Sequence, residues 1–525
     1  MSGVKIPGAK IPGAEMLVRT LMANGVDTCF ANPGTSELHA LAAFDSMPGA
    51  RCVPTLFEGV ATGAADGYAR MTDRPAATLL HLGPGLANGL ANLHNARRAR
   101  VPMVNIVGDH ATWHRGVDAP LTSDVEGLAK PMSAWVRTVP DAASVAADTA
   151  EAIRAALTPP CGVSTLILPS DSSWDDTAAA EPIIVEPPVP AAPDAEALRA
   201  AADALRSGER VVVLLNGRAT RAEGLALAGQ IAAATGAKLY AHTGATRIER
   251  GAGRVTVERF PYPIDLGIAA LAGAKHVVLI GSGEPVGFFG YPDKPSRLAP
   301  EDCRIHTVAP PGSDALAALR WLVEAVGAAG TPAPAQPLAP PSPATGALTA
   351  DSVGQSLAAL LPEGAIVVDE GISSSPMVYT ACAGARPHDW LTITGGAIGI
   401  GMPLALGAAI ACPDRKVVTV QADGSGMYTL QALWSQAREQ ADVVTIIFAN
   451  RRYGILQWEL GNLGFRDMGP NARNCTELGR PDLDWVALAR GMGVEGGQAT
   501  DAESFNRLLS AAFARKGPFL IEAVI

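Results

Sequence analysis

The fold is indicated most directly by residues 417–426, which read Val417-Val418-Thr419-Val420-Gln421-Ala422-Asp423-Gly424-Ser425-Gly426. This mostly β-branched run stops at a carboxylate and two glycines, and a second apolar run, residues 443–449, stops at Asn450. A stretch of helical composition, residues 430–439, lies between the two runs. The order strand, helix, strand predicts that Asp423 and Asn450 lie at the C-terminal edge of neighbouring parallel strands, where open α/β sheets bind ligands.

The residue types at this edge suit a metal ion bound together with phosphate. The carboxylate of Asp423 and the carboxamide of Asn450 offer the hard oxygen ligands that Mg2+ takes alongside phosphate oxygens. Gly424 lets backbone N–H groups approach those phosphates closely. The motif alone leaves an alternative open, because an acidic turn can follow a buried strand in any doubly wound domain.

Length and composition narrow the classes of protein. A chain of 525 residues is too long for one hydrophobic core. The net charge of −10, without a long basic run, argues against a nucleic-acid partner. No run approaches about 18 apolar residues, so we expect no membrane partner. Residues 1–13 lack an apolar segment and are interpreted as a short flexible lead, not a signal peptide.

The seven cysteines are scattered and form no C-x-x-C pair. This pattern indicates reduced thiols of a cytoplasmic protein, not a disulfide framework or a zinc site.

Two stretches rich in proline and alanine, residues 181–193 and 331–345, are interpreted as linkers. They separate three pieces, 1–180, 194–330 and 346–525, in which apolar strands alternate with helices rich in alanine and leucine. Apolar strands in repeated βα units are typical of parallel sheets that are covered on both faces. The sequence therefore predicts an α/β fold of three consecutive doubly wound parallel-sheet domains.

Two further segments carry chemistry. Glu58 opens an otherwise small and apolar helical stretch, residues 58–70, and a buried carboxyl there is suited to holding or passing a proton. A plain helix N-terminal carboxylate, stabilised by the macrodipole, is equally compatible with that stretch. The glycine-rich run 395–403 has one bulky residue, Ile398, at its centre and indicates close backbone approach to a ligand, or a turn before a helix.

Taken together, these segments resemble the thiamine diphosphate-dependent decarboxylases and synthases. The family's diphosphate motif begins Gly-Asp-Gly and closes on Asn-Asn, where this chain has Ala422-Asp423-Gly424 and Ala449-Asn450. Further matches are the helix that starts at Glu58 and continues to Asp66-Gly67-Tyr68-Ala69-Arg70, and the loops 32–38 and 83–85. The resemblance covers essentially the whole chain and implies a pyrimidine-binding domain, a central domain and a diphosphate- and Mg-binding domain, in that order.

The resemblance also implies a set of site residues. The Mg2+ ligands would be Asp423, Asn450 and the backbone carbonyl of Arg452. Residues in contact with thiamine diphosphate would be Glu58, Ser373, Gly396, Ile398, Gly424, Ser425, Asn450 and Tyr453. Glu58 would bond the pyrimidine ring, and Ile398 would hold the cofactor's two rings in a V shape.

The same resemblance implies that the cofactor lies at a subunit interface of a homodimer or homotetramer. FAD, which some family members hold in the central domain, is not favoured here, because residues 194–330 contain no clean G-x-G-x-x-G.

Four positions bear on the reaction. His81 stands where benzoylformate decarboxylases have a catalytic histidine, although a packed imidazole is the alternative; a histidine can transfer protons near neutral pH. Thr35 stands at the position of their active-site serine. Glu459 replaces an apolar aromatic, and residues 285–291 lack their second catalytic histidine.

We therefore predict non-oxidative decarboxylation of a small-molecule 2-keto acid to an aldehyde, with some carboligation, and with Glu58, His81 and Thr35 as catalytic residues. The alternative is an acetolactate synthase-like carboligase that condenses two 2-keto acids. Gln457-Trp458 resembles a segment of those synthases, whereas the chain ends at Ile525 without the segment that caps their site. A remote alternative is a catalytically silent binding protein with the same fold.

Overall fold

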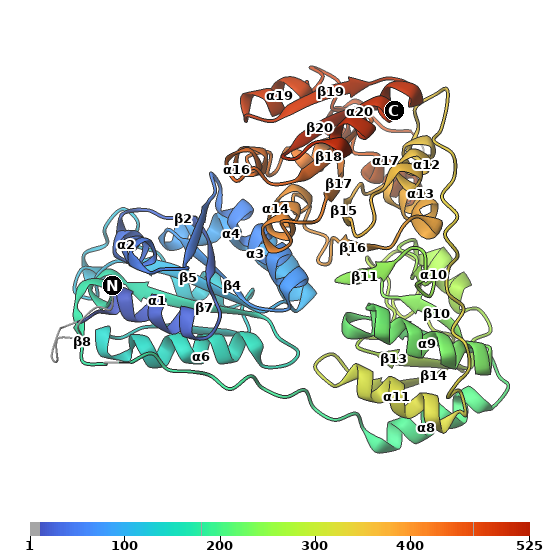
Figure 1. The fold of residues 1–525 in the computed structure, drawn as a ribbon, viewed down its shortest axis with the longest axis horizontal. Helices are drawn as coiled ribbons and strands as arrows, with labels where there is room; N and C mark the ends of the chain where they lie inside the picture. The colour runs from blue at the N-terminus through green and yellow to red at the C-terminus, as the bar shows by residue number, and fades with distance from the viewer. Residues whose placement is uncertain (1–10, 180, 466) are drawn as a thin grey trace. The chain divides into compact units, whose positions relative to one another are not determined.

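The computed structural model describes residues 11–179, 181–465 and 467–525. It contains three mainly parallel sheets with helices on their faces, so the predicted α/β fold of consecutive doubly wound domains is confirmed (Figure 1). The chain divides into two compact units. One comprises Met1–Val189, Gly395–Pro413 and Thr429–Ala441, and the other comprises Pro190–Thr394, Asp414–Tyr428 and Asp442–Ile525.

The first unit is built on a six-stranded parallel sheet of order β3-β2-β4-β5-β7-β6. Its strands are β2 Thr28–Asn32, β3 Arg51–Pro54, β4 Ala76–Leu80, β5 Met103–Asp109, β6 Trp135–Thr138 and β7 Val163–Pro169. Its main helices are α1 Gly13–Ala23, α2 Leu38–Ser46, α3 Glu58–Thr72, α4 Leu82–Ala99, α6 Val145–Leu157, α14 Gly401–Ala411 and α16 Ala432–Arg438.

Helices α3 and α14 pack unusually closely within this unit. A Cβ added at Gly67 would lie 2.1 Å from the Leu404 carbonyl oxygen, and one added at Gly407 would lie 1.8 Å from that of Ala64. The two glycines therefore let the helix backbones touch. Almost every residue of α3 is buried, including Glu58 at its first position.

The central segment forms a five-stranded parallel sheet of order β12-β10-β9-β13-β14. Its elements are α8 Ala195–Arg206, β9 Val211–Leu215, α9 Ala222–Thr235, β10 Lys238–Ala241, β12 Glu258–Arg259, α10 Ile264–Leu271, β13 His276–Ile280, β14 Arg304–Ala309 and α11 Ala315–Ala325. Alternate residues of β9 belong to two different cores: Val213 lies in one and Leu214 in the other. Both faces of this sheet are therefore covered.

The C-terminal segment forms a seven-stranded sheet of order β11-β16-β15-β17-β18-β20-β19. Its strands are β11 Arg247–Arg250, β15 Ile366–Glu370, β16 His388–Thr392, β17 Val417–Ala422, β18 Val443–Ala449, β19 Glu495–Ala499 and β20 Phe519–Val524. Its helices include α12 Ala350–Leu360, α13 Ser375–Ala381, α15 Asp423–Gly426, α17 Gly454–Asn462, α18 Pro470–Thr476, α19 Trp485–Gly491 and α20 Ala502–Ala514.

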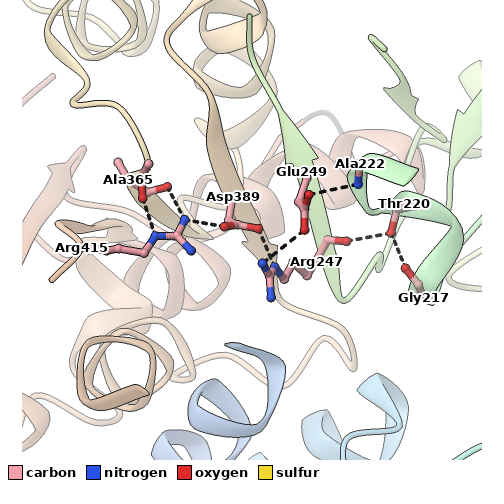
Figure 2. A network of polar contacts seen from close by, with 9 residues as sticks. Gly217, Thr220, Ala222, Arg247, Glu249, Ala365, Asp389 and Arg415 are labelled. Atoms are coloured by element: carbon pink, nitrogen blue, oxygen red, sulfur yellow. Dashed lines mark hydrogen bonds and ion pairs between the residues drawn. The ribbon is translucent and has the colours of Figure 1, made fainter. Parts of the chain in front are cut away.

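One strand of this sheet, β11, comes from the central segment and pairs antiparallel with β16. Figure 2 shows the polar network at this junction, in which Asp389 bonds Arg247 of β11 on one side and Arg415 on the other. The Thr220 hydroxyl donates to the Arg247 carbonyl oxygen at 2.7 Å. The sequence did not predict this exchange, because β11 is short and its register depends on Asp389, 142 positions further along the chain.

Candidate active site

Polar side chains collect at the C-terminal edge of the first unit's sheet. Glu58 follows β3, Thr35 follows β2 and His81 follows β4, and these are three neighbouring strands in the order β3-β2-β4. The structure thus brings the three predicted catalytic residues to one edge.

Glu58 is 7% exposed, and its carboxylate accepts a hydrogen bond from Asn88 Nδ2 at 3.0 Å. Gly85 leaves the space that this carboxylate needs, because a Cβ there would lie 3.2 Å from Glu58 Oε1 and 3.3 Å from the Cβ of His81. Glu58 and His81 therefore converge on residues 83–85, which the sequence resemblance treats as a loop and which form the first turn of α4 in the structure.

His81 is not a free imidazole. Its Nδ1 lies 2.8 Å from Glu37 Oε2, which also accepts the backbone N–H of Gly34 at 2.7 Å. A Cβ at Gly34 would overlap the ring, at 2.3 Å from Nδ1, so the close approach requires glycine there. Nδ1 is committed to Glu37, and Nε2 is the ring nitrogen left to exchange a proton.

Glu37 is 2% exposed, and its Oε1 is buried without a hydrogen-bond partner among the described residues. Burial raises the pKa of Glu37 above its usual range, while the hydrogen bonds from Gly34 and His81 oppose that rise. Sequence reasoning gave Glu37 no role. Its position could have indicated one, because the loop after β2 must lie beside the residue that ends β4 when the two strands are neighbours.

Thr35 is exposed at the start of a short 3-10 helix, Thr35–Glu37, between Gly34 and the buried Glu37. Its hydroxyl makes no hydrogen bond within the described residues, so the loop holds it in an accessible place.

The glycine-rich run 395–403 also belongs to the first unit. Asn95 of α4 donates to the Ala397 carbonyl oxygen at 2.7 Å and accepts the Gly395 N–H at 3.1 Å. Gly396 has a left-handed φ of 77° and Ile398 is partly exposed. One side chain of α4 therefore holds the backbone at two positions just before Ile398.

The second group of predicted residues lies in the other unit, where it also follows neighbouring strands. Ser373 comes after β15, Asp423 after β17 and Asn450 after β18, in the sheet order β15-β17-β18. The register pairs Ala422 with Phe448, so the ends of β17 and β18 coincide. The sequence prediction that Asp423 and Asn450 share an edge is confirmed.

Asp423 is 3% exposed, and backbone N–H groups donate to its carboxylate. Oδ1 accepts from the Gly424 N–H at 2.8 Å and Oδ2 from the Arg451 N–H at 2.7 Å. Burial raises the pKa of this carboxyl, and the backbone hydrogen bonds and Arg451 lower it less. The bond to Arg451 holds a residue in the left-handed region, with φ 57°.

The residues around Asp423 belong to two segments, one after β17 and one after β18. The carboxamide oxygen of Asn450 accepts the Arg452 N–H at 3.1 Å. Gly424 lies under the ring of Tyr453, since a Cβ there would be 2.4 Å from its Cε1. The Ser425 hydroxyl is buried and accepts from Gln421 Nε2 at 2.6 Å.

These residues fit a divalent cation. A buried carboxylate with a raised pKa gains from a positive charge beside it, and the carboxamide oxygen of Asn450 supplies a second hard ligand. No group of three or more His, Cys, Asp or Glu side chains forms a metal cluster in the described part of the chain. A cation here would therefore also need a backbone carbonyl and ligands from the cofactor.

Helix α17 starts just after these residues and carries Glu459, which the sequence resemblance places where benzoylformate decarboxylases have an apolar aromatic. Its two carboxylate oxygens accept hydrogen bonds from Tyr262 and Tyr291, each at 2.6 Å. Burial and the neighbouring Glu459 raise the pKa of Tyr291 to about 12, and they raise that of Tyr262 further, so both phenols remain donors near neutral pH. Tyr291 belongs to the segment 285–291, in which no second histidine was found.

Comparison with known proteins agrees with this arrangement. The description "Thiamine pyrophosphate enzyme, N-terminal TPP binding domain" matches residues 11–130, and the corresponding C-terminal TPP binding domain matches residues 371–523. The chain is 52% identical over 516 residues to a putative acetolactate synthase large subunit, IlvX, of Mycobacterium tuberculosis, covering 98% of this chain and 99% of that protein.

Benzoylformate decarboxylase of Pseudomonas aeruginosa is 30% identical, with 96% of each chain covered. Among solved structures, a thiamine diphosphate-dependent 4-hydroxybenzoylformate decarboxylase from Rhodococcus jostii RHA1 superposes with a TM-score of 0.83 at 25% identity, covering 98% of this chain and 99% of that one. The chain belongs to the thiamine diphosphate-dependent enzymes of the decarboxylase and acetolactate synthase type.

Within residues 11–179, 181–465 and 467–525, no helix combines the length and the apolar character that a membrane crossing requires.

Proposed function

We propose that the chain catalyses the thiamine diphosphate- and Mg2+-dependent, non-oxidative decarboxylation of a 2-keto acid to an aldehyde. The observation that carries this proposal is the Glu37–His81 pair, at the same sheet edge as Glu58 and Thr35. Aldehyde formation ends with protonation of a carbon, whereas acetohydroxy acid formation ends with attack on a second keto acid. An oriented imidazole supports the first outcome.

The chain's own residues divide the work. Thiamine diphosphate, when bound, supplies the electron sink for loss of CO2. Asp423, Asn450 and the carbonyl of Arg452 would hold Mg2+, and Ser373, Gly424, Ser425 and Tyr453 would line the diphosphate, with Gly396 and Ile398 placed under the cofactor's rings.

Glu58 would hold a proton at a pyrimidine nitrogen. The ionised Glu37 would accept the Nδ1 proton of His81 and fix the ring, so that Nε2 can pass a proton to the substrate's reacting carbon. Thr35 would add a hydroxyl group at the same sheet edge.

Glu459 supports the same choice of product. Helix α17 begins beside the Mg2+ residues, because a Cβ at Gly454 would lie 3.5 Å from Ser373 Oγ and 3.7 Å from Asn450 Nδ2. Glu459 is five residues along, roughly 7–8 Å at about 1.5 Å per residue. We expect a carboxylate on this helix to disfavour the approach of a second keto-acid anion.

The second candidate function is acetolactate synthase-like carboligation, and the 52% identity to the protein described as a putative synthase subunit favours it. A catalytically silent binding protein is a weaker alternative, because Glu58, Asp423 and Asn450 are all present. The proposal further expects a cytoplasmic homodimer or homotetramer in which one copy supplies the Glu58 side of each site and another supplies the Asp423 side. FAD is not part of it.

The test is a product assay. Purified protein with thiamine diphosphate and Mg2+ is incubated with a panel of 2-keto acids that includes benzoylformate and pyruvate, and aldehyde and acetolactate are quantified. Aldehyde as the main product from at least one acid is expected. Acetolactate as the main product would refute decarboxylation as the function, and inactivity across the panel would favour the silent alternative.

A further inference from the structure

Two cysteines are paired directly across neighbouring strands of the first unit. The parallel register of β2 and β3 places Cys29 opposite Cys52. Both side chains belong to the same apolar cluster, Cys29 as a buried member and Cys52 as a partly buried one, so they point to the same face of the sheet. Parallel strands lie about 4.8 Å apart, within the Cα separation of about 4.4–6.8 Å that a disulfide spans.

We propose that Cys29 and Cys52 form a reversible disulfide when the protein meets a peroxide or a small-molecule disulfide. Both thiols are free in the structure. The sequence pattern indicated reduced thiols and gave no reason to pair these two, because 22 residues separate them in the chain and only the strand register brings them together.

The two thiols differ in a way that sets the order of reaction. Cys29 is fully buried, whereas Cys52 lies on the edge strand β3 and is partly exposed. A hydrogen bond between them lowers the pKa of Cys52 and raises that of Cys29. Cys52 therefore ionises first and is the accessible nucleophile, and Cys29 is the resolving thiol.

Hydrogen peroxide can supply the two oxidising equivalents that the disulfide requires. The Cys52 thiolate attacks one peroxide oxygen and the O–O bond breaks; the departing hydroxide takes a proton and leaves as water. The sulfur of Cys29 then attacks the sulfenic acid, loses its own proton and displaces a second hydroxide as water. Two thiols are oxidised by two electrons, and one peroxide is reduced to two waters.

The bond would act on the predicted catalytic edge. Strand β2 leads within a few residues to Thr35 and Glu37, and β3 leads to Glu58. A bridge between directly opposed residues must pull the strands away from their resting geometry, and such strain makes a disulfide easier to reduce. A displacement of about 1 Å at these groups can cost about 10²-fold in rate.

The covalent test does not depend on the proposed function. Reduced full-length protein is treated with hydrogen peroxide or oxidised glutathione, digested without reductant and mapped by mass spectrometry. A peptide pair linked through Cys29 and Cys52 that disappears on dithiothreitol treatment is expected. Cys475→Ser, which removes an exposed thiol elsewhere, should form the same link, whereas Cys52→Ser should not.

A Cys52 that is converted to sulfinic acid or to a mixed disulfide while Cys29 stays free would overturn the proposal. Because Cys29→Ser changes a buried position and can impair folding, the partly exposed Cys52→Ser is the deciding variant.

A second arm rests on the proposed function. Oxidised wild type should lose about 10²-fold of its keto-acid turnover and recover it with dithiothreitol, whereas Cys52→Ser should keep its activity under the same oxidant. Turnover that survives in fully linked protein would overturn the coupling to the catalytic edge. If neither form turns over a keto acid, the decarboxylase proposal fails while the peptide map still decides the disulfide.

Discussion

The two sheet edges hold their carboxylates in different ways. At the edge of the first unit, the Glu58 carboxylate is bonded by the Asn88 side chain, and the Glu37 carboxylate by His81 and by the Gly34 backbone N–H. At the edge of the second unit, both oxygens of Asp423 are bonded by backbone N–H groups, one from Gly424 after β17 and one from Arg451 after β18. A histidine partner that can itself ionise suits proton transfer, whereas carboxylate oxygens held only by backbone N–H groups suit a cation and phosphate. The same strand-end topology therefore supports two different kinds of chemistry.

The largest effect is expected at Glu58. Glu58→Gln keeps the size of the side chain but removes its ability to hold the proton, so turnover should fall by about 10³-fold, within the range of acid–base catalysis. Binding of thiamine diphosphate, measured by calorimetry, should change far less. Glu439→Gln is the matched control, because Glu439 is a carboxylate of the same unit that pairs with Arg51. A Glu58→Gln enzyme with near-normal turnover would remove the proton-transfer role of this edge.

At the sheet edge of the second unit, a substitution should weaken the binding of Mg2+. Asp423→Asn should weaken Mg2+ binding by about 10²-fold, and calorimetry with Mg2+ and thiamine diphosphate measures this. Asp482→Asn, which alters the half-exposed partner of the Arg451 side chain, should bind Mg2+ as the wild type does. Equal affinities in Asp423→Asn and wild type would show that the carboxylate only caps the turn.

The protonation of Asp423 gives this edge a pH signature. Its pKa is raised above the ordinary value of 3.8 because the carboxyl is buried. As pH falls toward that raised pKa, a proton competes with Mg2+ for the carboxylate, so the metal-free, protonated form becomes more favourable. Apparent Mg2+ affinity should therefore decline at a higher pH than for an exposed aspartate; an affinity that is flat from about pH 8 to about pH 4 would contradict the assignment.

A smaller effect is expected at the Glu37–His81 pair. His81→Ala should lower aldehyde formation by at least about 10²-fold, whereas Glu37→Gln, which keeps a hydrogen-bond acceptor for Nδ1, should cost about tenfold. The pKa of Glu37 is raised by burial, so wild-type activity should fall on the acid side at a pH above the usual carboxyl range. Glu37→Gln should shift that limb of the pH profile. If His81→Ala retained full decarboxylation, the pair would be only structural.

The smallest effect is expected where Tyr262 and Tyr291 donate hydrogen bonds to Glu459. Tyr291→Phe removes one of two donors to Glu459 and should cost about 1.5–3 kcal/mol in unfolding free energy, as for a hydrogen bond to a charged group. Glu459→Gln removes the charge and should raise the acetolactate share of the products by a few-fold. Thermal unfolding measures the first outcome and product analysis the second. An unchanged product ratio would show that Glu459 only stabilises the position of α17.

The sequence correctly predicted those features whose residues lie in short contiguous motifs. The fold, the shared edge of Asp423 and Asn450, and the helix that begins at Glu58 all follow from strand periodicity and from residue types beside glycine. It failed where partners come from distant segments. Glu37 is 44 residues from His81, Tyr262 is 197 from Glu459, and β11 pairs with a strand more than a hundred residues later. Such pairs depend on strand order and domain packing, which periodicity does not encode.

The proposed decarboxylation requires that residues at the sheet edge of the first unit deliver a proton to the carbon that becomes the aldehyde. The most direct test is to run the reaction with benzoylformate and with pyruvate in D2O and to follow the products by proton NMR. We expect aldehyde that carries deuterium at its carbonyl carbon. Acetolactate as the main product from pyruvate, without aldehyde from either acid, would contradict it.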